Sequence, residues 1–183
     1  MNIKSLSIDG LLLCEPMRHG DDRGWFMESY RKDALNEAAG RTVHFVQDNH
    51  SLSTAVGTLR GLHYQAPPCA QDKLVRCIAG SVLDVAVDVR RGSASYGQWI
   101  AVELSAQNAH QLFVPTGFLH GFVTREPNSE IAYKVSAPYS RDHDGSVLWK
   151  SAGVDWDLGA SAPILSGKDV DAPAFADWVS PFD

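Results

Sequence analysis

The sequence has few cysteines and no long apolar run, and each shortage excludes a class of protein. Only three cysteines occur among 183 residues, Cys14, Cys69 and Cys77, and no CxxC motif is present. So sparse and odd a set does not make a disulfide framework, and a reducing cytoplasm is the simplest compartment. No apolar stretch approaches the roughly 20 residues that a membrane helix needs. The first residues lead into a mixed segment, so no signal peptide is predicted.

Positive charge is also in short supply. The chain has 16 Lys and Arg against 22 Asp and Glu, and its formal net charge is −6. This balance argues against DNA or RNA as the main partner, because neutralising phosphates needs a surplus of basic residues. A small anionic ligand needs only a few local cations and is compatible with it. The composition, 44% hydrophobic and 21% charged, is that of a soluble globular protein, and residues 1–183 are expected to form a single domain.

Helical periodicity is scarce. The clearest helix candidate covers residues 32–39, where Asp33 can accept first-turn N–H groups and Gly40 ends the helix. The chain from residue 152 is rich in Ala, Asp, Ser and Pro, and is expected to form an irregular tail with short helical turns, packed on the rest.

Most of the remaining chain has the pattern of short strands. Residues 81–90 alternate strictly, with Leu83, Val85, Val87 and Val89 on one face. Further strand-like runs, separated by Gly, Pro, Asn and Asp, lie at residues 99–104, 111–114, 121–124 and 131–135. Many short strands with almost no helix between them favour an antiparallel sandwich or closed barrel, whose interior can hold a ligand site.

Several ionisable side chains lie inside segments that are otherwise suited to burial. They are Arg60 and His63 beside leucines, Lys73 at the head of an apolar strand, His120 between two phenylalanines, and Tyr133 in an alternating run. Each alone has an ordinary structural explanation, such as a hydrogen-bonded core residue or a solvated lysine with a buried stem. Together, in one small β domain, they favour a pocket.

Other site chemistries lack their motifs. A metal site of the cupin type needs two histidines at i and i+2 on one strand, and the candidate position reads His63-Tyr64-Gln65. No GxSxG nucleophile motif, GxGxxG or P-loop is present, so any phosphate would be held by side chains.

In combination and order, these motifs resemble the dTDP-4-dehydrorhamnose 3,5-epimerase family over nearly the whole chain. The matching segments are DRGWFME at 22–28, QDNHS at 47–51, LRGLHYQ at 59–65, DKLV at 72–75, GSVLDVAVDVR at 80–90, VPTGFLHGF at 114–122, Tyr133, and SGKD at 166–169. The resemblance implies a mainly β, cupin-like jelly-roll barrel with a few short helices, a homodimer, and no metal or other cofactor.

The family's reaction inverts C3 and C5 of a 4-keto-6-deoxyhexose carried on dTDP. By resemblance, His63 is the base, Asp169 its partner, Lys73 the cation facing the C4 oxyanion, and Tyr133 the acid on the opposite face of the ring. The resemblance implies a substrate-binding set of Arg23, Phe26, Glu28, Gln47, Asn49, Arg60, Lys73, His120, Tyr139, Asp144 and Lys168. Within this set, Tyr139 is the expected stacking surface for thymine, and an arginine fork suits a diphosphate.

The chain departs from the family pattern in its C-terminal part. Asp144 stands where the family usually has Glu, Ser151 lies where it tends to read Trp-Asn-Asp-Pro, and Asp157 follows Trp156 in place of Pro. These changes leave open a relative that epimerises only C3 or C5 in another deoxysugar pathway. A non-catalytic nucleotide-sugar-binding barrel and a metal-dependent cupin enzyme are the further alternatives.

Overall fold

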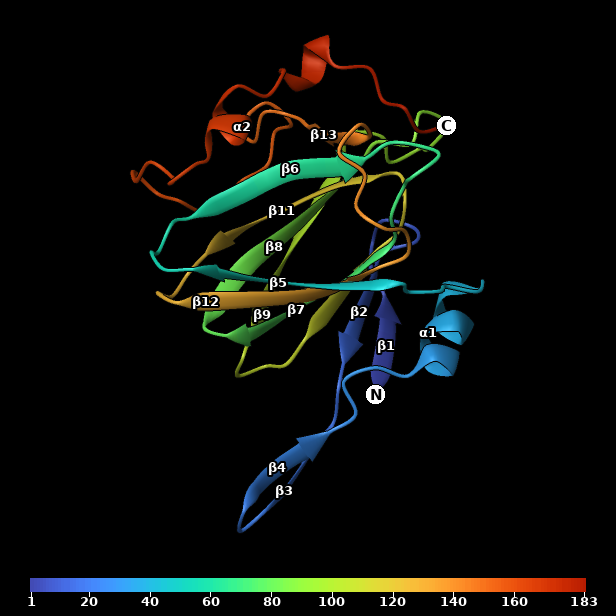
Figure 1. The fold of residues 1–183 in the computed structure, drawn as a ribbon, viewed down its shortest axis with the longest axis vertical. Helices are drawn as coiled ribbons and strands as arrows, with labels where there is room; N and C mark the ends of the chain where they lie inside the picture. Colours follow the sequence, from blue (N-terminus) through green and yellow to red (C-terminus); the bar gives the residue numbers. More distant parts are fainter.

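The computed structural model describes residues 1–183, and most of its strands form two facing antiparallel sheets (Figure 1). One sheet has the strand order β1-β2-β10-β7-β12-β5 and the other β13-β6-β11-β8-β9. The strands are β1 (Asn2–Ser5), β2 (Leu12–Glu15), β3 (Arg18–Asp21), β4 (Gly24–Met27), β5 (Gln47–Ser53), β6 (Leu59–Gln65), β7 (Lys73–Ala79), β8 (Ser81–Asp88), β9 (Trp99–Ser105), β10 (Gln111–Val114), β11 (Phe118–Thr124), β12 (Ser129–Val135) and β13 (Asp144–Ser146). The predicted mainly β, cupin-like barrel is confirmed.

The helices are short and lie outside the sheets. They are α1 (Lys32–Ala39), α2 (Gly167–Val170) and a 3-10 turn, η1 (Phe175–Asp177). The predicted helix 32–39 is confirmed, and Gly40 ends it in the left-handed conformation with φ 65°. Asp33 lies in the first turn, but the N-cap is Arg31 and no side chain caps the helix. None of these helices is long and apolar enough to cross a membrane.

The alternating strand β8 is buried on both faces. Val82 and Ala86 belong to the cluster between the sheets, whereas Val85 and Val87 pack on the opposite side. The C-terminal segment supplies the cover for that side, since Trp156 and Phe182 join the same outer cluster as Val85 and Val87. The tail therefore turns what would be a half-exposed sheet into the middle layer of the molecule.

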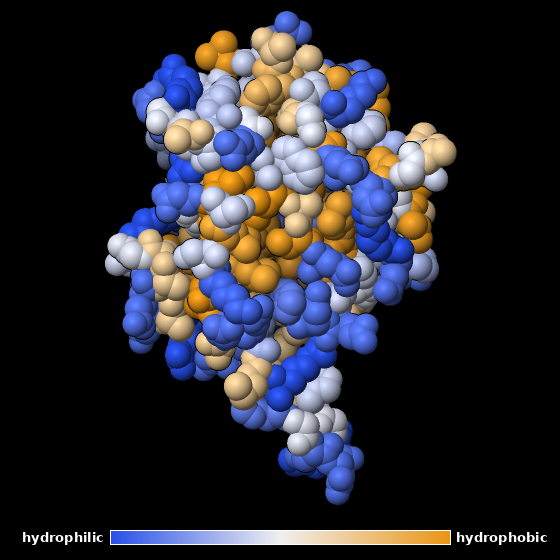
Figure 2. Space-filling view, turned by 180° about the vertical axis from the view of Figure 1, so that it is seen from behind, coloured by the Kyte–Doolittle hydropathy of each residue, from blue (hydrophilic) through white to orange (hydrophobic).

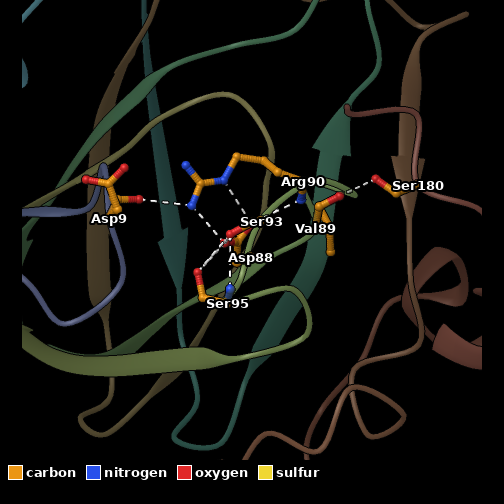
Figure 3. A network of polar contacts seen from close by, with 7 residues as sticks. All are labelled: Asp9, Asp88, Val89, Arg90, Ser93, Ser95 and Ser180. Atoms are coloured by element: carbon orange, nitrogen blue, oxygen red, sulfur yellow. Dashed lines mark hydrogen bonds and ion pairs between the residues drawn. The ribbon is translucent and has the colours of Figure 1, made fainter.

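A dense polar network closes the loop after β8 (Figure 3). Asp88, which is fully buried, accepts hydrogen bonds from Arg90 Nε at 2.9 Å, Ser93 Oγ at 2.6 Å and Ser95 Oγ at 2.6 Å. Burial raises the pKa of this carboxyl, but these bonds outweigh burial and lower it to about 2. Arg90 also donates to the backbone oxygen of Asp9 at 3.0 Å, so the network joins the loop to the N-terminal turn.

The β3–β4 hairpin projects away from the barrel (Figure 1), and Figure 2 shows it as a mostly hydrophilic arm below a face whose centre is apolar. Two large side chains of the arm are exposed, Trp25 at 57% and Phe26 at 71%. Burial in the barrel therefore does not account for the position of this hairpin.

Candidate active site

A bulge in β6 turns two functional side chains toward the space between the sheets. His63 pairs with His120, and Arg60 with Phe122, so β6 has one residue more than β11 over this stretch. Without the bulge, residues three apart on a strand would face opposite sides. The extra residue brings Arg60 and His63 to the same cavity.

Glycine is required at the bulge for two reasons. Gly61 has φ 143°, in the region that favours glycine, and a Cβ there would lie 2.7 Å from the Cα of Gly121 on the neighbouring strand. The LRGLH motif therefore encodes a close approach of β6 and β11 as well as the residues that line the cavity.

His63 is held by a buried carboxylate from the C-terminal segment. Nε2 of His63 donates to Asp169 Oδ1 at 2.6 Å, and Asp169, on α2, is 2% exposed. Ser166 Oγ donates to the other carboxylate oxygen at 2.6 Å. Burial raises the pKa of Asp169, but the bonds from His63 and Ser166 outweigh it and hold that pKa below its usual value. With the Nε2 proton in this bond, the lone pair of the ring is on Nδ1 and can accept a proton.

Lys73 and Tyr133 face the same cavity from the opposite sheet. Lys73 begins β7 and Tyr133 lies on the adjacent strand β12. Burial lowers the pKa of Lys73 to about 8, although the carboxylates of Asp84 and Asp144 partly oppose this. Burial also raises the pKa of Tyr133, which keeps its hydroxyl protonated at neutral pH, and nearby Arg60 opposes that shift.

A second His–Asp pair lies deeper in the barrel. His120 Nε2 bonds Asp84 Oδ1 at 2.9 Å, and Asp84 is fully buried. The other oxygen of Asp84 makes no hydrogen bond within the chain. Sequence reasoning missed Asp84 and Ser166 as site residues. An aspartate within the alternating apolar strand β8 is an unusual residue and could have indicated a site. Its partner His120 lies 36 residues away, so the sequence did not show that the two form a pair.

Two adjoining cavities, of about 430 and 260 Å³, share His63, Lys73 and Tyr133. The larger is also lined by Arg60, His120 and Asp169. The smaller is lined by most of the remaining residues of the expected binding set, namely Gln47, Asn49, Tyr139, Asp144 and Lys168. Asp144 accepts hydrogen bonds from the Tyr139 hydroxyl at 3.2 Å and from Lys168 Nζ at 2.6 Å, so these three form one group.

Three residues of the expected set are not brought to this cleft within one chain. Arg23 lies in the projecting hairpin and pairs with Asp21 at 2.5 Å, with its side chain 89% exposed. Phe26 is exposed in the same hairpin. Glu28 comes directly after the hairpin, and its carboxylate lies 3.7 Å from Arg31 Nη1. The reason is geometric, because the hairpin projects from the barrel rather than folding over the cleft (Figure 1).

No group of three or more His, Cys, Asp and Glu side chains is placed to hold a metal ion. The ionisable groups that do converge are a histidine held by a carboxylate, an ammonium group and a phenol. This set suits removal of a proton, stabilisation of the resulting anion and delivery of a proton from another direction.

Comparison with known proteins gives a consistent family. The model of the family described as dTDP-4-dehydrorhamnose 3,5-epimerase matches residues 5–177. The enzyme of that name from Shigella flexneri is 48% identical over 179 residues, which cover 97% of each chain. The crystal structure of the Elizabethkingia anophelis enzyme superposes with a TM-score of 0.93 at 41% identity, covering 98% of this chain and 99% of that one. A Legionella pneumophila 3,5-epimerase, solved in complex with dTDP-4-keto-L-rhamnose, has a TM-score of 0.89 at 43% identity and covers 94% and 92%.

Proposed function

The chain belongs to the dTDP-4-dehydrorhamnose 3,5-epimerase family, and from this premise we propose that it converts dTDP-4-dehydro-6-deoxy-D-glucose to dTDP-4-dehydro-L-rhamnose by inverting C3 and C5. The observation that carries the proposal is the cleft between the sheets, where the hydrogen-bonded His63–Asp169 pair faces Lys73 and Tyr133.

The first step is removal of a proton from a carbon next to the C4 ketone. His63 takes this proton on its free ring nitrogen, and the C–H electron pair moves into the enolate, whose charge lies on the C4 oxygen. Asp169 keeps the ring oriented and stabilises the imidazolium that forms. Lys73 is the cation that faces the C4 oxyanion, and its partial desolvation makes that interaction stronger than it would be in water.

The second step returns a proton from the other face of the sugar ring. Tyr133 donates its phenolic proton to the enolate carbon, the C4 ketone re-forms, and the configuration of that carbon is inverted. The phenolate and the imidazolium then exchange protons with solvent, which restores both groups. The same cycle at the second carbon completes the double epimerisation.

The smaller cavity suits the nucleotide end of the substrate. Tyr139 is 59% exposed and its ring can stack on thymine, and Lys168 adds a cation in the same cavity. Arg60 supplies a guanidinium group in the larger cavity. Gln47, Asn49, His120 and Asp144 complete the proposed binding set.

A homodimer is part of the proposal. The β3–β4 arm, which carries Arg23 and Phe26 and is followed at once by Glu28, reaches away from its own barrel and exposes two aromatic side chains. A second copy of the chain would cover these aromatics and receive Arg23 and Glu28 at the edge of its own cleft. Light scattering of the wild type would then give twice the mass of one chain, and deletion of residues 18–27 would give a monomer.

The deciding experiment is incubation with dTDP-4-keto-6-deoxyglucose in D₂O, with deuterium at C3 and C5 followed by NMR. Label at both carbons is the expected result. Label at a single carbon would replace the double epimerase with a mono-epimerase. The departures from the family pattern at Asp144, Ser151 and Asp157 would then be the first candidates for the cause. Binding without label would reduce the chain to a nucleotide-sugar-binding barrel, and activity lost with a chelator would indicate a metal-dependent enzyme.

A further inference from the structure

Three glutamine side chains hold the backbone of residues 137–140, the segment that carries Tyr139. This segment has no regular secondary structure, so its backbone N–H and C=O groups are hydrogen-bonded by side chains rather than by a neighbouring strand. The bonds reach four consecutive residues: Gln71 Nε2 to Ala137 O at 2.7 Å, Gln65 Nε2 to Pro138 O at 3.0 Å, Tyr139 N to Gln47 Oε1 at 3.1 Å, and Ser140 N to Gln65 Oε1 at 2.8 Å.

Gln65 is the central member of this group. It makes two of the four bonds, one on each side of Tyr139, and also donates to the backbone oxygen of Cys69. Its side chain is buried, with 4% of the residue exposed. Removing its amide would leave the partly buried backbone groups of Cys69 and Ser140, and the carbonyl of Pro138, without this partner, so the segment on both sides of Tyr139 would lose its hold on β6.

The position of Gln65 in the fold links this segment to the proton-transfer end of the cleft. His63 and Gln65 are two residues apart on β6, after the bulge, and both line the smaller cavity. Residues two apart on a strand face the same side and lie about 7 Å from one another along it. Gln65 is also paired with Asp144 of β13, whose carboxylate accepts the Tyr139 hydroxyl bond.

We propose that Gln65 is a positioning residue that holds Tyr139 at a fixed offset from His63, and thereby sets where the base of the nucleotide lies when the sugar is at His63. This rests on the proposed function, because it takes Tyr139 to be the surface on which the thymine ring stacks. Gln65 itself need not touch the substrate, since it acts through the backbone on either side of Tyr139.

The test uses Gln65→Met, which keeps the volume of the side chain and removes its amide. We expect the dissociation constant for dTDP to rise about tenfold, because the two hydrogen bonds that fix the backbone on either side of Tyr139 are lost and binding must then order this segment. KM should rise with it, whereas kcat at saturating substrate should stay within about threefold, because His63 and Tyr133 are untouched. Amide hydrogen exchange at Tyr139 and Ser140 should become faster, while exchange in β8 and β11 stays unchanged.

The matched control is Asn108→Leu. Asn108 is also a partly buried amide that holds a loop, with bonds to the backbone of Ser105, His110 and Glu103. It lines neither of the two cavities of the cleft. Asn108→Leu should change exchange in its own loop and leave dTDP affinity unchanged. An equal loss of affinity in both variants would overturn the proposal, because it would reflect general destabilisation.

A double-mutant cycle with Tyr139→Ala identifies the route of the effect. If Gln65 acts through Tyr139, Gln65→Met adds no further loss of dTDP affinity once the ring has gone. Additive losses would overturn the proposal. Should Gln65→Met fail to fold, Gln71→Met removes a single bond to the same segment, and a rise of about threefold in the dTDP dissociation constant is expected, again absent without the ring.

These measurements separate this proposal from the proposed function. Coupling between Gln65 and Tyr139 in dTDP binding, with no deuterium in the sugar, would leave the positioning role standing and remove the epimerase. Deuterium at both carbons with no such coupling would do the reverse.

Discussion

Two buried carboxylates, Asp88 and Asp169, are held in similar ways and serve different purposes. Asp88 accepts hydrogen bonds from two serine hydroxyls and Asp169 from one. Each also accepts from one nitrogen-bearing side chain, and each has a pKa below its usual value. The partners of Asp88 lie within seven residues of it, and they close one loop (Figure 3). The main partner of Asp169 is His63, 106 residues away and at the wall of a cavity.

The cationic side chains near the two carboxylates also differ, because one is paired within the chain and the other is not. Arg90 is paired with Asp88, and that hydrogen bond raises the pKa of the guanidinium group. Lys73 makes no hydrogen bond to a side chain of its own chain, and burial lowers its pKa. A network whose groups satisfy one another stabilises a fold, whereas a cluster that leaves a lysine ammonium and a histidine lone pair unmatched is ready for a substrate.

The largest expected effect is that of His63→Ala, which removes the proposed base from the cleft. We expect kcat/KM and deuterium exchange to fall about 10³-fold, in line with the contribution of a general base. The variant should keep its fold, but its melting temperature should fall, because buried Asp169 loses one of its two side-chain hydrogen-bond donors and keeps only Ser166. Exchange that persisted at the wild-type rate would remove His63 as the base.

Asp88→Asn should have the opposite profile. The folded-state pKa of Asp88, about 2, lies below its ordinary value of 3.8, so the carboxylate stabilises the fold above about pH 4 and this stabilisation is lost as the pH falls toward 2. The variant should therefore lose about 2 kcal/mol of unfolding free energy at pH 7, and should show less acid sensitivity between pH 4 and 2. Denaturant titration measures both quantities. An altered kcat/KM would contradict the purely structural role of this network.

The third prediction concerns Lys73. Since its pKa is lowered to about 8 and its proposed role needs the cationic form, kcat/KM should fall about tenfold per pH unit above pH 8. Lys73→Arg keeps the charge to much higher pH, so the alkaline limb should move upward in that variant even if its kcat is reduced. A limb that stays near pH 8 in Lys73→Arg would assign it to another group.

The smallest and most direct comparison pairs Ser166→Ala with Ser93→Ala. Each removes one hydroxyl that donates at 2.6 Å to a buried carboxylate, Asp169 in the first case and Asp88 in the second. At about 1 kcal/mol for one hydrogen bond, Ser166→Ala should lower kcat/KM about fivefold, and Ser93→Ala should lower stability by about 1 kcal/mol without affecting kcat/KM. Steady-state kinetics and denaturant titration of both variants measure these effects. A lower kcat/KM in Ser93→Ala, or an unchanged kcat/KM in Ser166→Ala, would contradict the prediction.

Much of the fold could be predicted because strand periodicity is a local property. The helix 32–39 and the strand 111–114 have the predicted bounds, and the strands predicted from residues 121 and 131 begin only two or three residues earlier, at Phe118 and Ser129. The same local pattern identified cleft residues such as Lys73 and His120, because each is a polar side chain within a run that is otherwise typical of a buried strand.

The rest depended on contacts between distant segments. Strict alternation would send Arg60 and His63 to opposite faces, and only the pairing of β6 with β11 reveals the bulge that brings them together. Asp84 is one of two aspartates on the alternating strand β8, and only the folded chain shows that its carboxylate bonds His120 of β11. The three glutamines that hold residues 137–140 have no shared motif and come from three separate segments of the chain.

The sequence by itself determined the strand pattern and, through its motifs, the resemblance to a family. Periodicity and turn chemistry act between neighbours, so they can be read along the chain. The resemblance implied that Asp169 is the partner of His63, and the structure gives the bond between them. Tertiary structure alone decided that two cavities share His63, Lys73 and Tyr133, that Asp84 bonds His120, and that the arm with Arg23 points away from its own cleft. The physical reason is that sheet order and register bring together residues 36 to 106 positions apart, and no local preference specifies such pairings.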